Sequence, residues 1–404
     1  MSNTSIAVLV SAVAFVVSAA MFPWALRFAR RHGIVDCPNA RKLQRVPVPV
    51  FGGVVVYLGI VAGWLVLMPF MGSEVLCCGL LAMTVMLAVG MWDDIRDIPA
   101  TLRLLVETVV VLAFIGITDV YVDDLHGLWG INSLSPRVGI PLSVVAGVGT
   151  INAVNLIDGV DGYSSGYGVL SCTCFALAFW TVWDPVLVCL TVIVAGALVP
   201  FFLHNVFGVR SKMFIGDGGT LMLGTLVVVL SFCALSGKVG LEPLEQRGMC
   251  IPAFVMAVAC IPLFDTLRVM TLRMLRGRSP FSADKTHLHH LFIDMGFSHL
   301  GAALSILALN GMVILVWLLS WQVGAPMDVQ VYIVVVLGLS VTFGFYKVMK
   351  AQQNGGPLDA EGYPQGTRLW HAARRMGTLT HREDRRFWRM LRNLMDGPMM
   401  KGWK

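Results

Sequence analysis

The sequence contains few charged residues. Asp, Glu, Lys and Arg together make up 13% of its 404 residues, whereas a soluble domain usually carries about 25%. A chain with so little charge cannot cover itself with the polar surface that a water-soluble protein needs. Apolar residues account for 56% of the sequence, and the mean hydropathy is +0.75. This composition excludes soluble, disordered and collagen-like proteins and predicts an integral membrane protein.

The nine cysteines lack the spacing of a disulfide framework or of a zinc site. Eight of them lie within apolar segments or at their edges. Cys37 lies in a segment that we expect in the cytoplasm, where thiols stay reduced. We therefore interpret all nine as small apolar residues that pack between helices.

Eleven apolar segments are long enough to cross a bilayer as helices, for which about 20 mostly apolar residues are needed. They lie near 5–26, 50–70, 75–92, 100–118, 141–157, 164–183, 185–205, 219–237, 250–268, 299–321 and 329–349. Glycines and two asparagines interrupt the fifth segment, so we expect it to be shielded by other helices or to line a polar cleft. The predicted fold is an all-α polytopic membrane protein with about eleven transmembrane helices.

The Lys and Arg residues are distributed unequally between the two sides of these segments. One set of alternating loops, together with the C-terminal segment, carries 27 of the 30, and the other set carries Arg137, Lys238 and Arg247. Because basic loops stay in the cytoplasm, we expect the N-terminus outside and the C-terminus in the cytoplasm. The net charge of +6 then faces an anionic leaflet, which indicates a lipid bilayer as partner and no nucleic acid.

We divide the chain into a transmembrane domain over 1–350 and a basic cytoplasmic tail over 351–404. The tail contains a predicted amphipathic helix near 382–395, in which Phe387, Leu391 and Leu394 recur at helical spacing among arginines. Such a helix beside a membrane lies in the headgroup plane. A solvated helix, or one that contacts a second subunit, explains the pattern equally well, so a homodimer is an alternative to a monomer.

Four clusters of polar residues lie at the ends of the predicted spans, at 92–97, 152–162, 214–219 and 284–290. Two spans separate each cluster from the next. All four clusters therefore fall on the predicted cytoplasmic side, although that orientation rests on Lys and Arg alone. This common sidedness predicts one shared active site on the cytoplasmic face.

The first two clusters have the pattern of a divalent metal site. Asp93 and Asp94 are adjacent, and both cannot ionise cheaply unless a cation or a basic group lies nearby. Asn155 and Asp158 are three residues apart and so share one helical face. Oxygen ligands contributed singly by several elements suit Mg²⁺, which keeps water ligands and accepts substrate phosphates as further ligands. The alternative is that these residues cap helices or form ordinary loop surface.

The third and fourth clusters favour phosphate binding. Asp217 lies in a glycine-rich turn whose backbone N–H groups are open to phosphate oxygens, although such turns also occur without a ligand. On one helix His287 and His290 lie about 60° apart, whereas His289 points about 200° away from His287. Three such imidazoles cannot close on one ion. We therefore favour anion binding, helped by Arg278, over a zinc site or an ordinary loop.

The remaining polar residues receive simpler interpretations. Glu107 follows Arg103 by four residues, and Asp265 precedes Arg268 by three, so each pair is expected to form an ion pair on a helix. His299 belongs to no recognisable constellation.

Taken in order, the motifs resemble those of the polyprenyl-phosphate N-acetylhexosamine-1-phosphate transferases, and within them the bacterial WecA-like branch. The resemblance covers about residues 35–300 and rests on Asp93-Asp94, Asn155 to Gly162, Phe214 to Gly219, and Ser279 to Asp284 leading into His287 to His290. It implies a multi-pass enzyme of the bacterial inner membrane that depends on Mg²⁺, with Mn²⁺ as an alternative ion. The implied reaction transfers N-acetylhexosamine 1-phosphate, first of all GlcNAc 1-phosphate, from a UDP-sugar to undecaprenyl phosphate and releases UMP.

The resemblance also implies roles for individual acidic and amide residues. Asn155 and Asp217 match the Mg²⁺ ligands, Asp93 and Asp94 match the catalytic aspartate pair, and Asp158 matches a further acidic residue. We expect Asp93 to keep the acceptor phosphate deprotonated. In the competing mechanism, Asp94 or Asp158 forms a covalent intermediate.

The implied substrate-binding residues surround this acidic centre. They are Asp161 near the uracil, Arg103 at a phosphate, and Arg278, His287, His289 and His290 at the diphosphate. Lys42 belongs to an early cytoplasmic motif that departs from the family pattern, because Gln44 and Val50 replace its usual His and Arg. This departure leaves the exact sugar open, with GalNAc and a deoxy-amino sugar as alternatives.

Two other classes of protein fit the sequence less well. A Mg²⁺-dependent membrane prenyltransferase needs a second Asp-rich motif, which the sequence lacks. A secondary transporter needs charged or broken segments near the midplane of two related halves, whereas the charges here lie at one membrane face.

Overall fold

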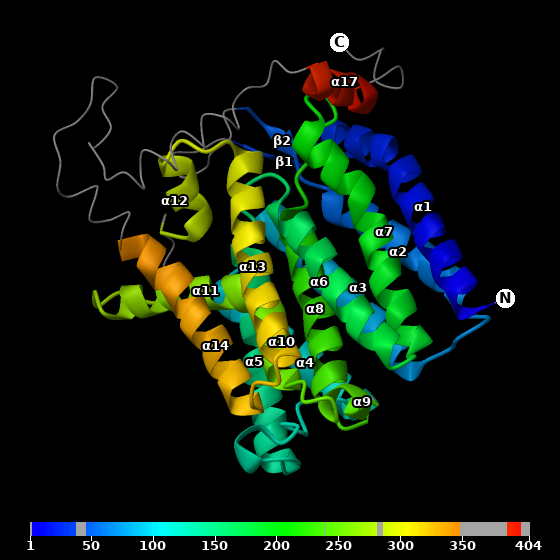
Figure 1. Ribbon diagram of the computed structural model, residues 1–404. Coiled ribbons are helices and arrows are strands. Elements are labelled where there is room, and N and C mark those ends of the chain that lie inside the picture. Colours follow the sequence, from blue (N-terminus) through cyan, green and yellow to red (C-terminus); the bar gives the residue numbers. More distant parts are fainter. Residues whose placement is uncertain (1, 38–45, 239, 281–285, 348–385, 397–404) are drawn as a thin grey trace.

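The computed structural model describes residues 2–37, 46–238, 240–280, 286–347 and 386–396. This part of the chain is a bundle of helices with one two-residue antiparallel strand pair (Figure 1). The helices are α1 (Asn3–Arg31), α2 (Gly52–Leu67), α3 (Glu74–Arg96), α4 (Ala100–Thr118), α5 (Pro136–Leu156), α6 (Tyr163–Thr181), α7 (Pro185–Phe207), α8 (Gly216–Leu235), α9 (Glu242–Glu245), α10 (Ile251–Val258), α11 (Cys260–Met274), α12 (Leu288–Asp294), α13 (His299–Gln322), α14 (Met327–Leu339) and α17 (Arg386–Met395). The short elements are β1 (Val35–Asp36), β2 (Val48–Pro49), η1 (Leu128–Gly130) and η2 (Ser340–Gly344).

Eight helices in the described part of the chain are long and apolar enough to cross a membrane. They are α1, α3, α4, α5, α7, α8, α13, and α14 continued through η2 to Lys347. The protein is therefore a polytopic all-α membrane protein, as the composition predicts. The other three predicted spans coincide with α2, which has 16 residues, with α6, and with the bent pair α10 and α11.

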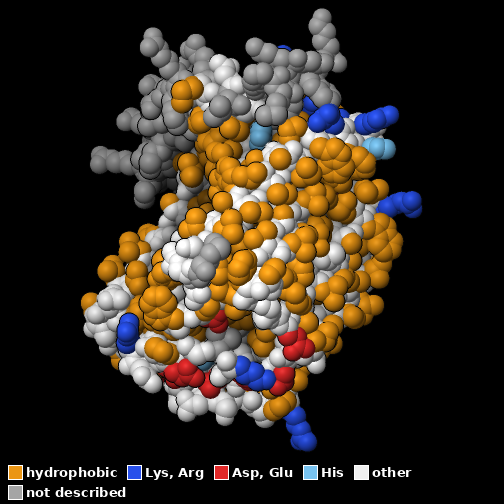
Figure 2. Space-filling model, turned by 90° about the vertical axis from the view of Figure 1, so that its right-hand side faces the viewer, with side chains coloured by type: hydrophobic (Ala, Val, Ile, Leu, Met, Phe, Trp, Pro, Cys, Tyr) orange, Lys and Arg blue, Asp and Glu red, His pale blue; other side chains and the backbone are white. Residues whose placement is uncertain are grey.

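The surface has the polarity expected of a protein that spans a bilayer. Hydrophobic side chains cover a broad band of the face shown in Figure 2, acidic side chains gather at its lower end, and several basic side chains lie at its upper end. Figure 1 shows the β1–β2 pair, α12 and α17 at one end of the bundle and α9 at the other. An apolar band flanked by charged ends fits the hydrocarbon core and the two interfaces of a membrane.

The ninth predicted span is broken, although the sequence predicts one continuous helix over 250–268. α10 and α11 meet at Ala259 with a bend of 72°. The buried side chain of Asn310, on α13, accepts the N–H of Ile261 (2.9 Å) and donates to the carbonyl of Val258 (3.2 Å). Backbone groups without partners are very costly in hydrocarbon. Asn310 therefore supplies the hydrogen bonds that make this break possible.

The helix α8 forms the centre of the bundle, because almost all of its residues are buried. Small residues let its neighbours approach closely. A Cβ on Gly90 of α3 would lie 2.4 Å from the backbone N of Gly218, and a Cβ on Gly224 would lie 2.8 Å from the Cα of Ile151 on α5. These close approaches fix α3 and α5 against α8, and with them the polar residues at their ends.

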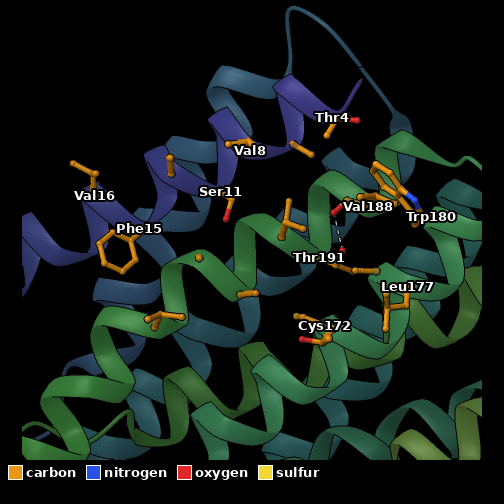
Figure 3. A pocket seen from close by; sticks show the side chains of 18 residues that line it. Thr4, Val8, Ser11, Phe15, Val16, Cys172, Leu177, Trp180, Val188 and Thr191 are labelled. Atoms are coloured by element: carbon orange, nitrogen blue, oxygen red, sulfur yellow. Dashed lines mark hydrogen bonds between the residues drawn. The ribbon is translucent and has the colours of Figure 1, made fainter. Parts of the chain in front are cut away.

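A lateral groove of about 800 Å³ lies between α1, α6 and α7 (Figure 3). Its lining is apolar apart from hydroxyl groups such as those of Ser11 and Thr191, and Thr191 donates its hydroxyl hydrogen to the carbonyl of Val188 (2.7 Å). None of the residues in the four polar clusters lines this groove. The groove therefore does not mark the candidate site.

Candidate active site

The first turn of α8 is capped by a side chain from α3. The two carboxylate oxygens of Asp94 accept the backbone N–H groups of Asp217 (3.0 Å) and Gly218 (3.2 Å). N–H groups in the first turn have no partner within their helix, and negative charge is favourable there. Gly216 makes this approach possible, because its φ is +74° and a Cβ there would lie 2.5 Å from Oδ2 of Asp94. Asp94 thus joins the first cluster to the third.

The two residues predicted to bind Mg²⁺ contact each other. Nδ2 of Asn155 donates to Oδ1 of Asp217 (2.8 Å) and to the hydroxyl of Thr220 (2.9 Å). Asn155 lies in the last turn of α5, and Asp217 lies in the first turn of α8. The contact joins the second cluster to the third across 62 residues of sequence.

Arg103, near the start of α4, lies in a charged network. Its guanidinium donates to Oδ2 of Asp93 (3.0 Å) and lies 3.5 Å from both Glu107 and Asn152. Oδ1 of Asp93 accepts the N–H of Ile98 (2.9 Å), and Asn152 donates to Glu107. The predicted pairing of Arg103 with Glu107 is confirmed, but Asp93 shares the same guanidinium. This network joins the first cluster to the second.

Asp158 lies in the loop between α5 and α6, where the hydroxyl of Ser164 donates to its Oδ1 (2.8 Å). The residue as a whole is exposed, whereas its carboxyl group is surrounded by protein atoms. This desolvation, together with the nearby carboxylates of Asp217 and Asp161, raises the pKa of Asp158 to about 7, although the hydrogen bond from Ser164 opposes the shift. Asp158 therefore exchanges its proton near neutral pH, unlike an ordinary aspartate.

Asp161 is held by two basic side chains. Its Oδ2 lies 2.6 Å from Nζ of Lys212 and 3.3 Å from Nδ1 of His299. Its Oδ1 is buried and has no hydrogen-bond partner within the described residues. A buried acceptor of this kind suits an N–H group of a ligand.

Sequence reasoning missed both partners of Asp161. It placed His299 in no constellation, which is wrong, because this histidine begins α13 beside Asp161. It did not single out Lys212. The position of this lysine just before the third cluster was the one feature of the sequence that could have indicated a role in the site. No spacing in the sequence indicates the contact with His299, because 138 residues separate the two positions.

Asp265 of α11 anchors the histidine loop. Nδ1 of His287 lies 2.9 Å from Oδ2 of Asp265, and the N–H of Leu288 donates to the same oxygen (3.2 Å). Arg268 donates to the other oxygen of Asp265 (2.7 Å), so the predicted pair is confirmed. A carboxylate at Nδ1 fixes the ring and directs Nε2 away from Asp265. Nε2 of His287 is buried and has no partner within the described residues.

The three histidines do not share one helix, because α12 begins after His287. The rings of His287 and His289 are parallel, with centroids 5.9 Å apart, and those of His289 and His290 are 4.3 Å apart. A Cβ on Gly159 would lie 2.0 Å from Nε2 of His289, so this ring lies against the second cluster. Burial, reinforced by the neighbouring histidines, lowers the pKa of His289 well below its usual value. His289 is therefore neutral at physiological pH.

The Gly-Gly pair after the early cytoplasmic motif packs against the start of α8. The N–H groups of Gly52 and Gly53 donate to the carbonyls of Phe214 and Ile215, both at 2.9 Å. A Cβ on Gly53 would lie 2.5 Å from the backbone N of Gly219. The described part of this motif therefore supports the third cluster.

Two predicted substrate-binding residues are not tied to the acidic centre by these contacts. Arg278 is exposed after the end of α11, where its N–H donates to the carbonyl of Arg273 (3.0 Å). Lys42 lies outside the described residues. The roles of both in substrate binding stay predictions.

The donor set suits a magnesium ion better than zinc. Within the described residues, no group of three His, Cys, Asp or Glu side chains is arranged to hold a metal ion. The side-chain amide of Asn155 lies beside the carboxylate of Asp217, to which its nitrogen donates, and the carboxylates of Asp94 and Asp158 lie close enough to repel that of Asp217. Mg²⁺ takes one or two carboxylates and fills its shell with water and substrate phosphate. These residues therefore fit that ion.

Comparison with known proteins agrees with the motifs. Residues 76–234, which contain the first three clusters, match glycosyl transferase family 4. The undecaprenyl-phosphate alpha-N-acetylglucosaminyl 1-phosphate transferase of Escherichia coli (strain K12) is 28% identical over 281 residues, which are 68% of this chain and 73% of the relative. Its namesake in Yersinia pestis is 29% identical over 303 residues (70% and 76%). A probable undecaprenyl-phosphate N-acetylglucosaminyl 1-phosphate transferase of Bacillus subtilis (strain 168) is 29% identical over 297 residues (71% and 78%). The resemblance indicated by the motifs is confirmed.

Proposed function

We propose that this chain transfers an N-acetylhexosamine 1-phosphate from a UDP-sugar to undecaprenyl phosphate and releases UMP. The match of residues 76–234 to glycosyl transferase family 4 supports this proposal. GlcNAc 1-phosphate is the first candidate for the transferred group, because the relatives are named for that sugar. GalNAc and deoxy-amino sugars are the alternatives. The observation that carries the proposal is the convergence of four clusters, far apart in sequence, through contacts among their own side chains and backbone.

We place this site at the cytoplasmic face of the bacterial inner membrane. In this arrangement α2, α6 and the broken pair α10 and α11 complete eleven spans, with the N-terminus outside and the C-terminus in the cytoplasm. The loops at the site end carry most of the Lys and Arg residues, which favours the cytoplasm for that end. The bacterial relatives support the choice of membrane.

We assign different residues of the site to the two parts of the donor substrate. Oδ1 of Asp161, which has no partner among the described residues, is the acceptor for the N–H group of uracil, and Lys212 beside it adds positive charge. Nε2 of His287 and the guanidinium of Arg103 are donors for phosphate oxygens. This division puts the nucleotide near α6 and α13 and the diphosphate near α4 and α12.

The reaction is a phosphoryl transfer. An oxygen of the lipid phosphate attacks the β-phosphorus of the UDP-sugar, the bond from that phosphorus to the bridging oxygen breaks, and UMP leaves with that oxygen. Positioning and positive charge are what such a transition state requires. A Mg²⁺ ion held by Asn155 and Asp217 would neutralise charge on the phosphate oxygens. We propose that Asp93, whose two oxygens accept hydrogen bonds from the N–H of Ile98 and from Arg103, keeps the acceptor phosphate deprotonated.

The direct test measures UMP release from the purified protein. Undecaprenyl phosphate is incubated with a panel of UDP-sugars, with and without Mg²⁺. We expect release with UDP-GlcNAc or another UDP-N-acetylhexosamine, and none after chelation. Asp217→Asn should lower the rate by about 100-fold or more. Asp123→Asn is the matched control, because Asp123 accepts the N–H of Gly237 (2.8 Å) just beyond the far end of α8. No UMP release from any donor, or full activity in Asp217→Asn, contradicts the proposal.

A covalent mechanism predicts a sugar-phosphate intermediate on the protein, which the single displacement lacks. Asp158 and Asp94 are the candidates for the nucleophile, but both oxygens of Asp94 accept backbone hydrogen bonds from α8. The single displacement therefore agrees better with the geometry at Asp94. Recovery of a sugar-phosphate adduct on Asp158 after acid quench would replace the single displacement with a double one.

A further inference from the structure

We propose that the C-terminal helix α17 positions the nucleotide end of the site through Asp396, the residue that follows its last turn. The inference rests on the proposed function, because it assigns the nucleotide to Asp161 and Lys212. Asp396 is a positioning residue: it touches a loop of the transmembrane domain and acts on the site through that loop.

The carboxylate of Asp396 gathers the backbone N–H groups of one short loop. It accepts the N–H groups of Val209 (3.2 Å), Arg210 (3.1 Å) and Ser211 (3.0 Å), and also the hydroxyl of Ser211 (3.0 Å). Burial alone raises the pKa of Asp396, but these hydrogen bonds outweigh it and hold the pKa below its usual value. Hydrogen bonds to an ionised group are stronger than those between neutral groups. The end of α17 is therefore fastened to the loop between α7 and α8.

The same loop leads directly into the candidate site. Lys212 follows Ser211, and its Nζ lies 2.6 Å from Oδ2 of Asp161. Asp161 holds its other oxygen buried and without a partner in the described chain. The path from Asp396 to Asp161 therefore contains one backbone segment and one salt bridge.

Other elements hold the opposite side of this loop. Arg30 of α1 donates to the carbonyl of Arg210, and Ser211 Oγ lies 3.0 Å from Nδ1 of His204 on α7. A Cβ on Gly208 would lie 2.3 Å from Oγ of Ser211, so the turn after α7 is tight. The carbonyl side of the loop is thus fixed by the transmembrane domain, and its N–H side is fixed by the tail. Removal of Asp396 frees the N–H side without removing α1 or α7 contacts.

The consequence is specific to one substrate. If the loop loosens, Lys212 no longer fixes Asp161 in one position, and the affinity for the nucleotide falls. The network of Asp93, Arg103 and Glu107 belongs to α3 and α4 and shares no residue with this loop. We therefore expect the affinity for the UDP moiety to fall, while the turnover number and the KM for undecaprenyl phosphate change less.

The test compares the full-length wild type with Asp396→Asn and Asp184→Asn. Asp184 is the matched control, because its carboxylate also accepts backbone N–H groups, those of Val186 (3.1 Å) and Leu187 (3.0 Å), but at the far end of α7. Titration calorimetry with UDP and Mg²⁺ measures the affinity without turnover. We expect Asp396→Asn to bind UDP on the order of tenfold more weakly and Asp184→Asn to bind it like the wild type.

Two further measurements separate positioning from general loss of structure. Hydrogen–deuterium exchange in the peptide over 209–212 should become faster in Asp396→Asn and stay unchanged in Asp184→Asn. In the UMP-release assay, the KM for the UDP-sugar should rise in Asp396→Asn with less than a twofold change in kcat, and Asp396→Glu should restore part of the loss. If Asp396→Asn does not fold, deletion of residues 386–404 replaces it, with the same expected loss of UDP affinity.

The outcomes for this inference and for the proposed function are distinct. Equal UDP affinity in the wild type and in Asp396→Asn, or in the deletion variant, overturns the positioning role. An equal rise in KM for UDP-sugar and lipid acceptor also overturns it, and so does a wild type that does not bind UDP. A wild type that binds UDP but releases no UMP from any donor refutes the proposed function alone.

Discussion

The contact between α3 and α8 provides a sharp test of the site geometry through Gly90. A Cβ at this position would lie 2.4 Å from the carbonyl carbon and oxygen of Asp217 and from the N of Gly218. These are backbone atoms, so no side chain can rotate to make room. Gly90→Ala must therefore push α3 away from the first turn of α8. A normal contact of about 3.5 Å requires a displacement of about 1 Å.

The displacement has two calculable consequences. Asp94 lies one turn after Gly90 on α3, and its hydrogen bonds to Asp217 (3.0 Å) and Gly218 (3.2 Å) would lengthen to about 4 Å, beyond hydrogen-bond distance. Overpacking of this kind costs about 1–3 kcal/mol in stability. A misplacement of about 1 Å in catalytic groups lowers rates by about 100-fold. We therefore expect a folded but much slower enzyme.

Gly79→Ala is the matched control, because Gly79 lies on the same helix and faces the same partner. A Cβ there would lie 3.5 Å from Cγ1 of Val229, which is an ordinary contact. The assay is UMP release together with thermal unfolding of the detergent-purified protein. We expect Gly79→Ala to resemble the wild type and Gly90→Ala to lose about 100-fold in kcat/KM. Wild-type activity in Gly90→Ala would refute the argument that close approach of α3 and α8 sets the site.

Three further predictions concern other parts of the structure. Arg103→Met leaves the buried carboxylates of Asp93 and Glu107 without their cation, so thermal unfolding should show a loss of about 3–5 kcal/mol, whereas Arg103→Lys should lose less. Asn310→Leu removes the hydrogen bonds at the break between α10 and α11, so the melting temperature should fall, and a melting temperature equal to that of the wild type would contradict the role of Asn310. The fold raises the pKa of Asp158 from 3.8 to about 7, so the folded protein binds more protons than the unfolded chain between these pH values. The stability of chelator-treated protein should therefore fall as the pH rises from about 4 to 7. Asp158→Asn cannot ionise, so it should melt above the wild type at pH 8 but not at pH 4, and equal melting temperatures at pH 8 would contradict the raised pKa.

Local sequence was informative wherever the deciding interactions are close along the chain. The pairs of Arg103 with Glu107 and of Asp265 with Arg268 follow from helical spacing and are confirmed. The helix over Arg386–Met395 lies within the predicted range 382–395. In each case the deciding residues share one helix.

Distant partners changed the interpretation of several residues. Asp94 lies beside Asp93 in the sequence, but it caps α8, whereas Asp93 pairs with Arg103. The adjacent carboxylates thus have separate partners, which their spacing did not reveal. The sequence pattern gives His299 no partner, whereas the fold places it against Asp161.

The sequence by itself determined that this is an integral membrane protein and that its polar clusters lie on one side of the apolar segments. Composition, the length of apolar segments and the distribution of basic residues act locally or additively, so they can be read without a fold. Only the tertiary structure decided which side chains meet, where the helix after Cys250 breaks, and how Asp396 of α17 reaches the loop before Lys212. Those contacts join residues tens to hundreds of positions apart, and their geometry depends on how closely the helices pack.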